Sequence, residues 1–468
     1  MNSAQLVFDL HKASTRARTG TGVVSLIAIF SLTVSATVAF LVAGGTWMFY
    51  QRSLHPEQAS AFVQEQQATN EFYLITWFYL AVFACAFILP ALFGLTAQAA
   101  VLGASGRERR LATLRLIGLS SRQVTRMTIV ETGFQALVGI TLGLGLSFLL
   151  APFFTRLSFQ ERAIALNEIL LPWWGYLLVA AILFLLALGA AFVGMQRVRV
   201  SPLGVARREM PAALKRWRFY LFIAIFVATV VALRLINISS SDVASIIGVI
   251  SFLLIVFMAI NLVSPYILQV CAYLFAYLPG NAHLVACRRI SSNARLAWKR
   301  SSAIAFFGFL IGYVMVSPLA SDGLTELYKE EQEVGIFFSD VSVGILLTLG
   351  FGFTITTVSV FLGQASEVFA SADLTRSLQL MGVRRRFFSS VALIEIMLPI
   401  VIVSLFGFLC GAPVGLVMLT VQAEVNIPAR LGFALSLLGA GWLVTFLAVL
   451  AVEPLRSRVL ATWRRKND

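Results

Sequence analysis

Two acidic residues, Glu131 and Glu395, lie inside long apolar stretches of the sequence, where a carboxylate could take part in chemistry. A carboxylate within an apolar span is costly and usually functional. It could brace a neighbouring segment through arginine or backbone amides, or relay protons. A solvated helix N-terminus, which acidic residues favour, is the alternative. The sequence holds no GxxxxGK(S/T), HExxH or GxSxG motif, so a Walker site, a zinc protease and a serine hydrolase find no support.

Histidine and cysteine do not form a metal-binding pattern in this sequence. No CxxC or Cys/His spacing is typical of zinc, and no cysteine pair is expected to form a disulfide. The three histidines fall outside the apolar stretches, and the four cysteines are scattered: His11, His55, His283, Cys85, Cys271, Cys287 and Cys410. We therefore expect no metal site.

The composition indicates a chain embedded in lipid. Hydrophobic residues make up 59% of the 468 residues and charged residues 12%, against about half and about a quarter in ordinary globular proteins. The 38 Phe and 33 Gly fit the same class, because glycine is commoner in transmembrane helices than in soluble ones. A soluble enzyme, a coiled coil and a disordered chain are excluded.

Ten apolar stretches are long enough to cross a bilayer, which takes about 20 residues each. They lie near 23–49, 73–102, 127–153, 173–195, 219–236, 243–269, 302–320, 341–366, 389–419 and 431–453. With both termini in the cytoplasm, 30 of the 36 Lys and Arg fall on the cytoplasmic side. This asymmetry is the positive-inside rule. The net charge of +14 therefore indicates topology and affinity for anionic lipid head groups, and no nucleic-acid partner is expected.

An internal repeat with an offset of 264 residues relates the two ends of the chain. It aligns Gly118 with Gly382, Glu131 with Glu395 and Gly143 with Gly407 without a gap, and three apolar positions before the glycine also match: Leu114 with Leu378, Leu116 with Leu380 and Ile117 with Met381. We predict an all-α polytopic fold in which two parallel repeats of four helices are joined by two linking helices.

Short basic segments precede both repeats, 6–18 and 284–295. In the first, apolar residues recur at helical spacing and basic residues take the other face, so we expect a helix in the inner membrane interface. The predicted organisation is residues 1–200 for the first repeat with its interfacial helix, 201–280 for the linker with two transmembrane helices, and 281–468 for the second repeat with its interfacial helix.

The run Arg109-Arg-Leu-Ala-Thr-Leu-Arg-Leu-Ile-Gly-Leu-Ser120, followed by Glu131, resembles the signature of FtsX-like permeases, the membrane subunits of MacB-type ABC transporters. The layout of four, two and four spans is most similar to the fused form of the BceB-type permeases. Those relatives carry a large extracellular domain, whereas the corresponding loops here have only about 20 residues. The resemblance implies a bacterial plasma membrane location.

The resemblance also implies a role for the turn between the second and third spans of each repeat, which seats in the ATPase. The implied coupling residues are Arg110, Leu114, Arg115, Ile117 and Gly118 in the first turn and Leu378, Gln379, Met381 and Gly382 in the second. Glu131 and Glu395 would brace these turns. A basic loop that lies on lipid head groups is the alternative.

Glycines four residues apart follow both turns. Gly139 and Gly143 form one GxxxG, and Gly407, Gly411 and Gly415 form a longer series. Small residues at this spacing let helix backbones approach closely, so we expect helix packing, with a contact that moves during transport as the alternative.

The sequence thus predicts a permease subunit that works with two copies of a separate ABC ATPase. ATP and Mg²⁺ would sit on the ATPase, and this chain would bind no cofactor and catalyse no reaction itself. Export or membrane extraction of an amphiphilic substrate is expected: an antimicrobial peptide, a hydrophobic drug, haem or a lipid. The alternatives are an ATP-driven signalling complex that acts on a partner protein, and an ion-coupled secondary transporter.

Overall fold

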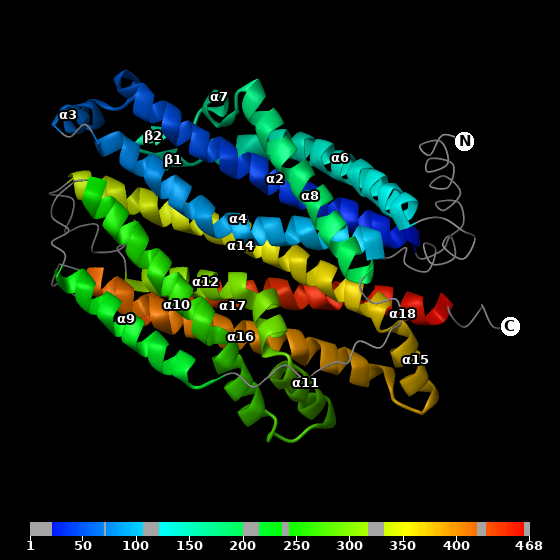
Figure 1. Ribbon diagram of the computed structural model, residues 1–468. Coiled ribbons are helices and arrows are strands. Elements are labelled where there is room, and N and C mark those ends of the chain that lie inside the picture. The colour runs from blue at the N-terminus through cyan, green and yellow to red at the C-terminus, as the bar shows by residue number, and fades with distance from the viewer. Residues whose placement is uncertain are drawn as a thin grey trace, which may run out of the picture.

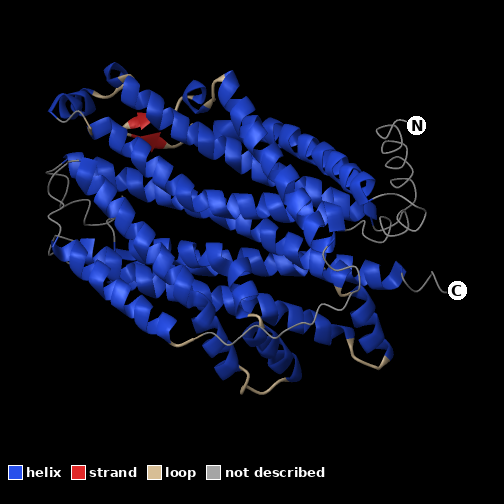
Figure 2. Cartoon of the chain, viewed as in Figure 1, coloured by secondary structure: helices blue, strands red, loops and turns tan. Residues whose placement is uncertain are grey.

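The protein is a bundle of long helices. The computed structural model describes residues 21–69, 72–105, 121–199, 215–235, 243–316, 332–418 and 427–462. Helix accounts for almost all of this part, as Figure 2 shows. A lipid-embedded backbone has no water to bond, so its polar groups have to be satisfied within the chain, which a helix does.

Ten helices of the described part carry the ten predicted stretches, one stretch to a helix, apart from the few residues at helix ends that lie outside the description. They are α2 (Thr21–Leu54), α4 (Tyr73–Ser105), α6 (Ser121–Phe154), α8 (Trp173–Arg199), α9 (Trp217–Leu235), α10 (Val243–Phe275), α12 (Ala294–Val316), α14 (Gln332–Ala370), α16 (Arg385–Met418) and α17 (Ile427–Ala451). Eight of them are long and apolar enough to cross a membrane. Within the described residues, α9 and α12 have shorter apolar portions, Trp217–Ala232 and Ile304–Tyr313.

Short elements mark the two ends of the bundle (Figure 1). One end, here called the hairpin end, carries η1 (Pro56–Gln58), α3 (Ala61–Thr69), the antiparallel strands β1 (Ser158–Phe159) and β2 (Arg162–Ala163), and α7 (Leu166–Ile169). The opposite end, here called the turn end, carries α15 (Ala372–Leu380) and α18 (Glu453–Thr462). A further helix, α11 (Asn281–Ser292), joins α10 to α12 and packs against α10 and α16. It is the helix predicted over 284–295.

The most extensive helix–helix contact in the described part joins α12 to α16. A Cβ placed on Gly407 or Gly411 of α16 would overlap a backbone carbonyl oxygen of α12. The relation is reciprocal, because a Cβ on Gly308 or Gly312 of α12 would overlap a carbonyl oxygen of α16. Gly415 is also buried. Gly407 and Gly411 therefore lie where the backbones of α12 and α16 approach closely.

The GxxxG of the first repeat packs α6 against α2 in the same way. A Cβ on Gly139 would lie 2.6 Å from the Cβ of Leu32, and one on Gly143 would lie 2.6 Å from the Cβ of Ala36. The Thr37 hydroxyl also donates to the carbonyl of Gly143 at 3.2 Å. Only glycine leaves room for this approach.

Helix α14 belongs to both apolar cores of the bundle. Its residues Ile355 and Leu362 pack into the core built by α2, α4, α6 and α8. Leu349, closer to the hairpin end of the same helix, packs into the core of α10, α12, α16 and α17. Figure 1 shows α14 beside α4 in the middle of the bundle, and the two are joined by a hydrogen bond from Ser359 to Gln98 of 3.1 Å.

The glycine contact between α12 and α16 makes a testable prediction. We expect Gly308→Ala to lower the free energy of unfolding by about 1–3 kcal/mol, the usual cost of overpacking, because the new methyl group collides with the Ser404 carbonyl. The thermal unfolding midpoint of the purified protein in detergent measures this. Gly189→Ala on α8 is the control, because its Cβ meets nothing within 4 Å. Equal midpoints for Gly308→Ala and the unmodified chain would contradict the packing argument.

Candidate functional site

The turn between α15 and α16 ends its helix with a complete Schellman motif. The N–H of Val383 donates to the carbonyl of Leu378 at 3.1 Å, and the N–H of Gly382 donates to the carbonyl of Gln379 at 3.0 Å. Gly382 has a φ of +95°, a conformation that suits glycine and strains other residues. The predicted residue Met381 caps the helix. The sequence thus folds into a short helix, a sharp turn and the start of α16.

Apolar side chains project from this turn. Leu380 is 80% exposed and Met381 71% exposed, and Leu374 on the same helix is also exposed. Three arginines, 384–386, follow directly and are exposed as well. Among the described elements, α15 has its main contacts with its neighbours α14 and α18 at this end of the bundle. A projecting helix with large exposed apolar residues and a basic flank is typical of a docking surface.

The first predicted turn lies outside the described residues. This applies to Arg110, Leu114, Arg115, Ile117 and Gly118. The helix that precedes that turn, α4, and the helix that follows it, α6, are both described, and they correspond to α14 and α16 in the repeat.

Glu395 forms an ion pair at the base of α16. Its carboxylate lies 3.3 Å from the guanidinium of Arg289 on α11. The partner in the structure is therefore the short helix before α12 and not an arginine of the turn. The pair is partly exposed, and such pairs contribute about 1 kcal/mol or less to the free energy of folding. Its main effect is to position α11 against α16.

Glu131 occupies a buried polar stripe on α6. Glu131 is 8% exposed, and Thr128, Thr132 and Gln135 on the same helix are buried with it. The side-chain amide of Gln135 donates to the hydroxyl of Ser25 on α2 at 3.1 Å. Glu131 thus lies where α6 begins to pack against α2. This differs from the setting of Glu395, although the two residues are equivalent in the repeat.

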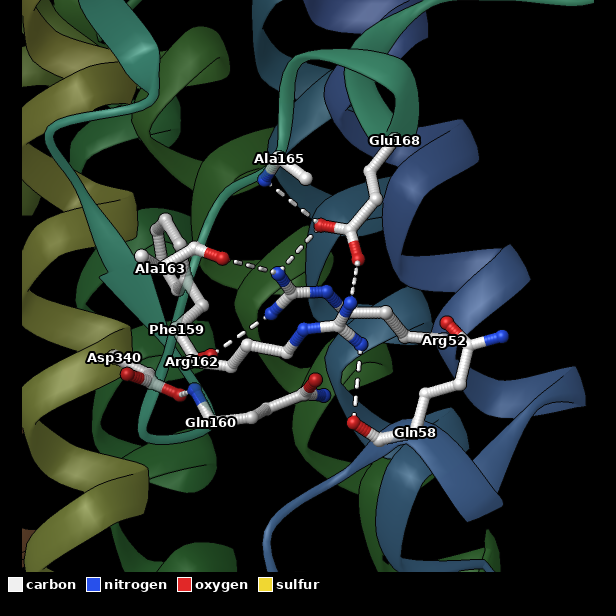
Figure 3. Close-up of polar contacts among 9 residues, drawn as sticks. All are labelled: Arg52, Gln58, Phe159, Gln160, Arg162, Ala163, Ala165, Glu168 and Asp340. Atoms are coloured by element: carbon white, nitrogen blue, oxygen red, sulfur yellow. Dashed lines mark hydrogen bonds and ion pairs between the residues drawn. The ribbon is translucent and has the colours of Figure 1, made fainter.

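A second polar cluster, which the sequence does not reveal, lies at the hairpin end (Figure 3). Arg52 at the end of α2 is 8% exposed, and its guanidinium lies 2.7 Å from the carboxylate of Glu168 on α7. It also donates to the carbonyl of Phe159 at 2.8 Å and to that of Ala163 at 3.4 Å. Arg162 adds a second ion pair to Glu168 at 3.3 Å. The hairpin is thereby fastened to α2.

The hairpin itself is strained. Its two-residue loop consists of Gln160 and Glu161, whose φ values are 57° and 59°. Positive φ at both positions defines a type I′ turn, which usually takes Asn-Gly because larger residues strain there. The strained backbone is held from outside, because the N–H of Gln160 donates to the Asp340 carboxylate at 2.8 Å.

Asp340 connects this hairpin to the rest of the bundle. It lies near the start of α14, is 6% exposed, and accepts a second hydrogen bond of 2.9 Å from the indole N–H of Trp77 on α4. One carboxylate oxygen thus joins α14, α4 and the segment after α6. We define the hairpin cap as Arg52, Trp77, the hairpin 158–163, Glu168 and Asp340.

The hairpin cap could not be predicted from the sequence, because the side chains that contact one another in it are far apart in the chain. Arg52 and Glu168 are separated by 116 residues, and Trp77 and Asp340 by 263. The sequence carries only a weak signal for this cluster: Arg52 follows directly after an apolar stretch, and few other basic residues are expected at the same end of the bundle.

The comparisons with known proteins agree with this architecture. Residues 86–202 match the family described as FtsX-like permease C-terminal. This segment is an FtsX-like permease domain. The permease domain covers the second half of α4, the first predicted turn, α6 and α8, and it includes both Glu131 and the strained hairpin. It confirms the resemblance based on residues 109–120. No curated protein matches the chain.

The second prediction concerns the buried ion pair between Arg52 and Glu168 in the hairpin cap. Removing one partner of a buried pair strands the other charge, which typically costs about 3–5 kcal/mol. We expect Arg52→Ala to cost roughly 3 kcal/mol, the low end of that range, because Arg162 remains beside Glu168.

The thermal unfolding midpoint in detergent measures the effect of Arg52→Ala. Arg156→Ala is the matched control, since Arg156 is exposed in the same connection and should leave the midpoint unchanged. If both variants unfold at the same temperature, the ion pair does not hold the hairpin to α2.

Proposed function

We propose that this chain is the permease subunit of a bacterial ABC transporter and works with two copies of a separate ATPase. FtsX-like permeases are membrane subunits of such transporters, which fits residues 86–202. The observation that carries the proposal is the turn after α15, where Leu380 and Met381 are exposed on a rigidly capped helix at the turn end. An exposed apolar pair on a stiff support suits a groove in a partner protein.

Two equivalent turns in one chain support the proposed stoichiometry. The offset of 264 residues places Gly118, Leu116 and Ile117 opposite Gly382, Leu380 and Met381. The first of these turns falls within the matched segment 86–202. Each turn would seat in one ATPase, with ATP and Mg²⁺ bound by the ATPase and no cofactor bound by the permease.

Helix packing supports ten spans in two parallel repeats. Gly143 on α6 contacts α2, and its equivalent Gly407 on α16 contacts α12, so in both halves the third helix packs on the first through the same position. The proposed units are residues 1–200, 201–280 and 281–468, with α9 and α10 as the linking pair.

The turn end is proposed to face the cytoplasm, with both termini on that side of the plasma membrane. Basic residues gather there: Arg384–Arg386 after the turn, and Arg456 on α18. The positive-inside rule favours this orientation.

The contacts suggest how movement would cross the membrane. Because their backbones touch, α6 with α2, and α16 with α12, would each move as one rigid pair. ATP-driven closure of the ATPase pair would bring the turns at the bases of α6 and α16 together. The ends of α2, α4 and α14 far from the turns meet in the hairpin cap, so the cap would receive this displacement.

An amphiphilic cargo that arrives from the lipid, and leaves outward or out of the bilayer, fits this architecture best. The loops at the hairpin end are short and form no separate domain in the described part, so they offer little to capture a soluble ligand. An ion-coupled transporter would place carboxylates at mid-membrane. The two buried carboxylates of the described residues, Glu131 and Asp340, lie instead in the first third of their helices, toward opposite ends of the bundle.

The turn supplies the third prediction. We expect Gly382→Val to lower ATP turnover of the reconstituted complex by about fivefold or more, because positive φ strains a β-branched residue by about 1–3 kcal/mol. Leu380→Asp should reduce co-purification of the ATPase, since it places a charge on the exposed apolar surface. Gly118→Val should have the larger effect, because the residues around Gly118 are more similar to the turn of the FtsX-like permeases.

The matched control is Gly363→Val on α14, where an added Cβ meets nothing within 4 Å and φ is not positive. This variant should insert, co-purify and hydrolyse ATP as the unmodified protein does. Full ATPase activity and co-purification in Gly382→Val and Leu380→Asp would refute the coupling role and leave the turn as a lipid contact.

The stoichiometry is the fourth prediction. The native mass of the detergent-solubilised complex should equal one copy of this chain, 51.1 kDa, plus two ATPase subunits. An assembly of two such chains with two ATPases would contradict the proposal that one chain contains both halves of the permease.

A further inference from the structure

A compact cluster of hydrogen-bond donors lies at the junction of α10 and α11 and has no role in the proposed coupling. Tyr273 is on the last turn of α10 and Tyr277 follows that helix, and both side chains are exposed. Their rings pack edge to face with centroids 5.6 Å apart. The guanidinium of Arg288 on α11 lies over the ring of Tyr273, 5.8 Å from its centroid. The three side chains therefore form one exposed patch.

Two donors of this patch point to no acceptor among the described residues. Tyr277 donates its hydroxyl hydrogen to the hydroxyl oxygen of Tyr273 at 2.9 Å, so Tyr273 accepts that bond and its own hydrogen stays available. The same hydrogen bond raises the pKa of Tyr277, which keeps that phenol neutral. Arg288 makes no ion pair within the described ranges, whereas its neighbour Arg289 is paired with Glu395. A guanidinium cation with the free hydroxyl hydrogen of Tyr273 beside it is left to bind an anion.

The surroundings of the patch are apolar and lie at the end of a membrane span. The apolar span in α10 ends at Phe275, so Tyr277 and Arg288 would lie at head-group depth. Leu274 and Leu278 are exposed beside the tyrosines, and Leu284 is exposed on α11. Tyrosine is enriched at this depth, and the planar guanidinium matches the geometry of a phosphate. A free phosphate would make no use of the leucines, but the acyl chains of a lipid would.

We propose that Tyr273, Tyr277 and Arg288 bind the phosphate of an anionic phospholipid whose acyl chains pack along Leu274 and Leu278. Arg288 and the hydroxyl of Tyr273 donate to the phosphate. The bound lipid would hold α11 in place against α10, while the Arg289–Glu395 pair holds the same helix against α16.

Native mass spectrometry of the purified, delipidated chain, titrated with phosphatidylglycerol, tests the site. The unmodified chain should bind one phosphatidylglycerol more tightly than phosphatidylcholine. Arg288→Gln should weaken this binding about fivefold, the typical effect of one basic residue near an anionic surface. Tyr273→Phe should also weaken it, because this change removes the hydroxyl that donates to the phosphate and keeps the ring. Lys215→Gln removes the same charge from an exposed residue before α9 and should bind as the unmodified chain does.

Three results would overturn the proposal: equal phosphatidylglycerol binding by Arg288→Gln and the unmodified chain, equal binding of phosphatidylcholine and phosphatidylglycerol, or displacement of the lipid by inorganic phosphate at similar concentration. Tyr273→Phe keeps the ring and its packing, so it remains informative if Arg288→Gln folds poorly.

Discussion

The glycines of α12 and α16 bring two helix backbones into direct contact over a long stretch, and the same contact recurs between α2 and α6. Within a bilayer this matters more than in water, because lipid tails are as apolar as leucine and the hydrophobic effect drives helices together only weakly. Close packing of small residues takes over that role. The two glycine-packed pairs are the stable units on which the other helices and both ends of the bundle are arranged.

The hairpin cap solves a different problem at the hairpin end. Arg52 is buried, and a buried charge is tolerated only when it is paired and hydrogen-bonded. Glu168 supplies the pairing, and carbonyls of the hairpin supply the hydrogen bonds. Because the carboxylate of Asp340 binds the strained turn and α4 together, the conformation of the hairpin depends on where α14 lies.

Features with a local or periodic signal could be predicted from the sequence, and features that depend on distant partners could not. The apolar stretches predicted where the long helices lie. Helix α2 nevertheless continues to Leu54, beyond the predicted end at 49, because a helix can extend past the apolar part of its sequence. The glycine spacing predicted close packing but not the partner helix. The ion pair of Glu395 with Arg289 and the contacts of Asp340 join segments more than 100 residues apart, and no pattern along the chain encodes such pairs.

The position of α14 in both cores has a consequence for how the protein is made. The first four long helices are complete at Arg199, but the side chains of α14 that fill their core belong to a helix that begins at Gln332. At about 5–20 residues per second, a ribosome needs roughly 7–27 s for that interval. During this time the side chains that later pack against α14 are not yet covered by it. The core of the first four helices is therefore completed only after α14 has been synthesised.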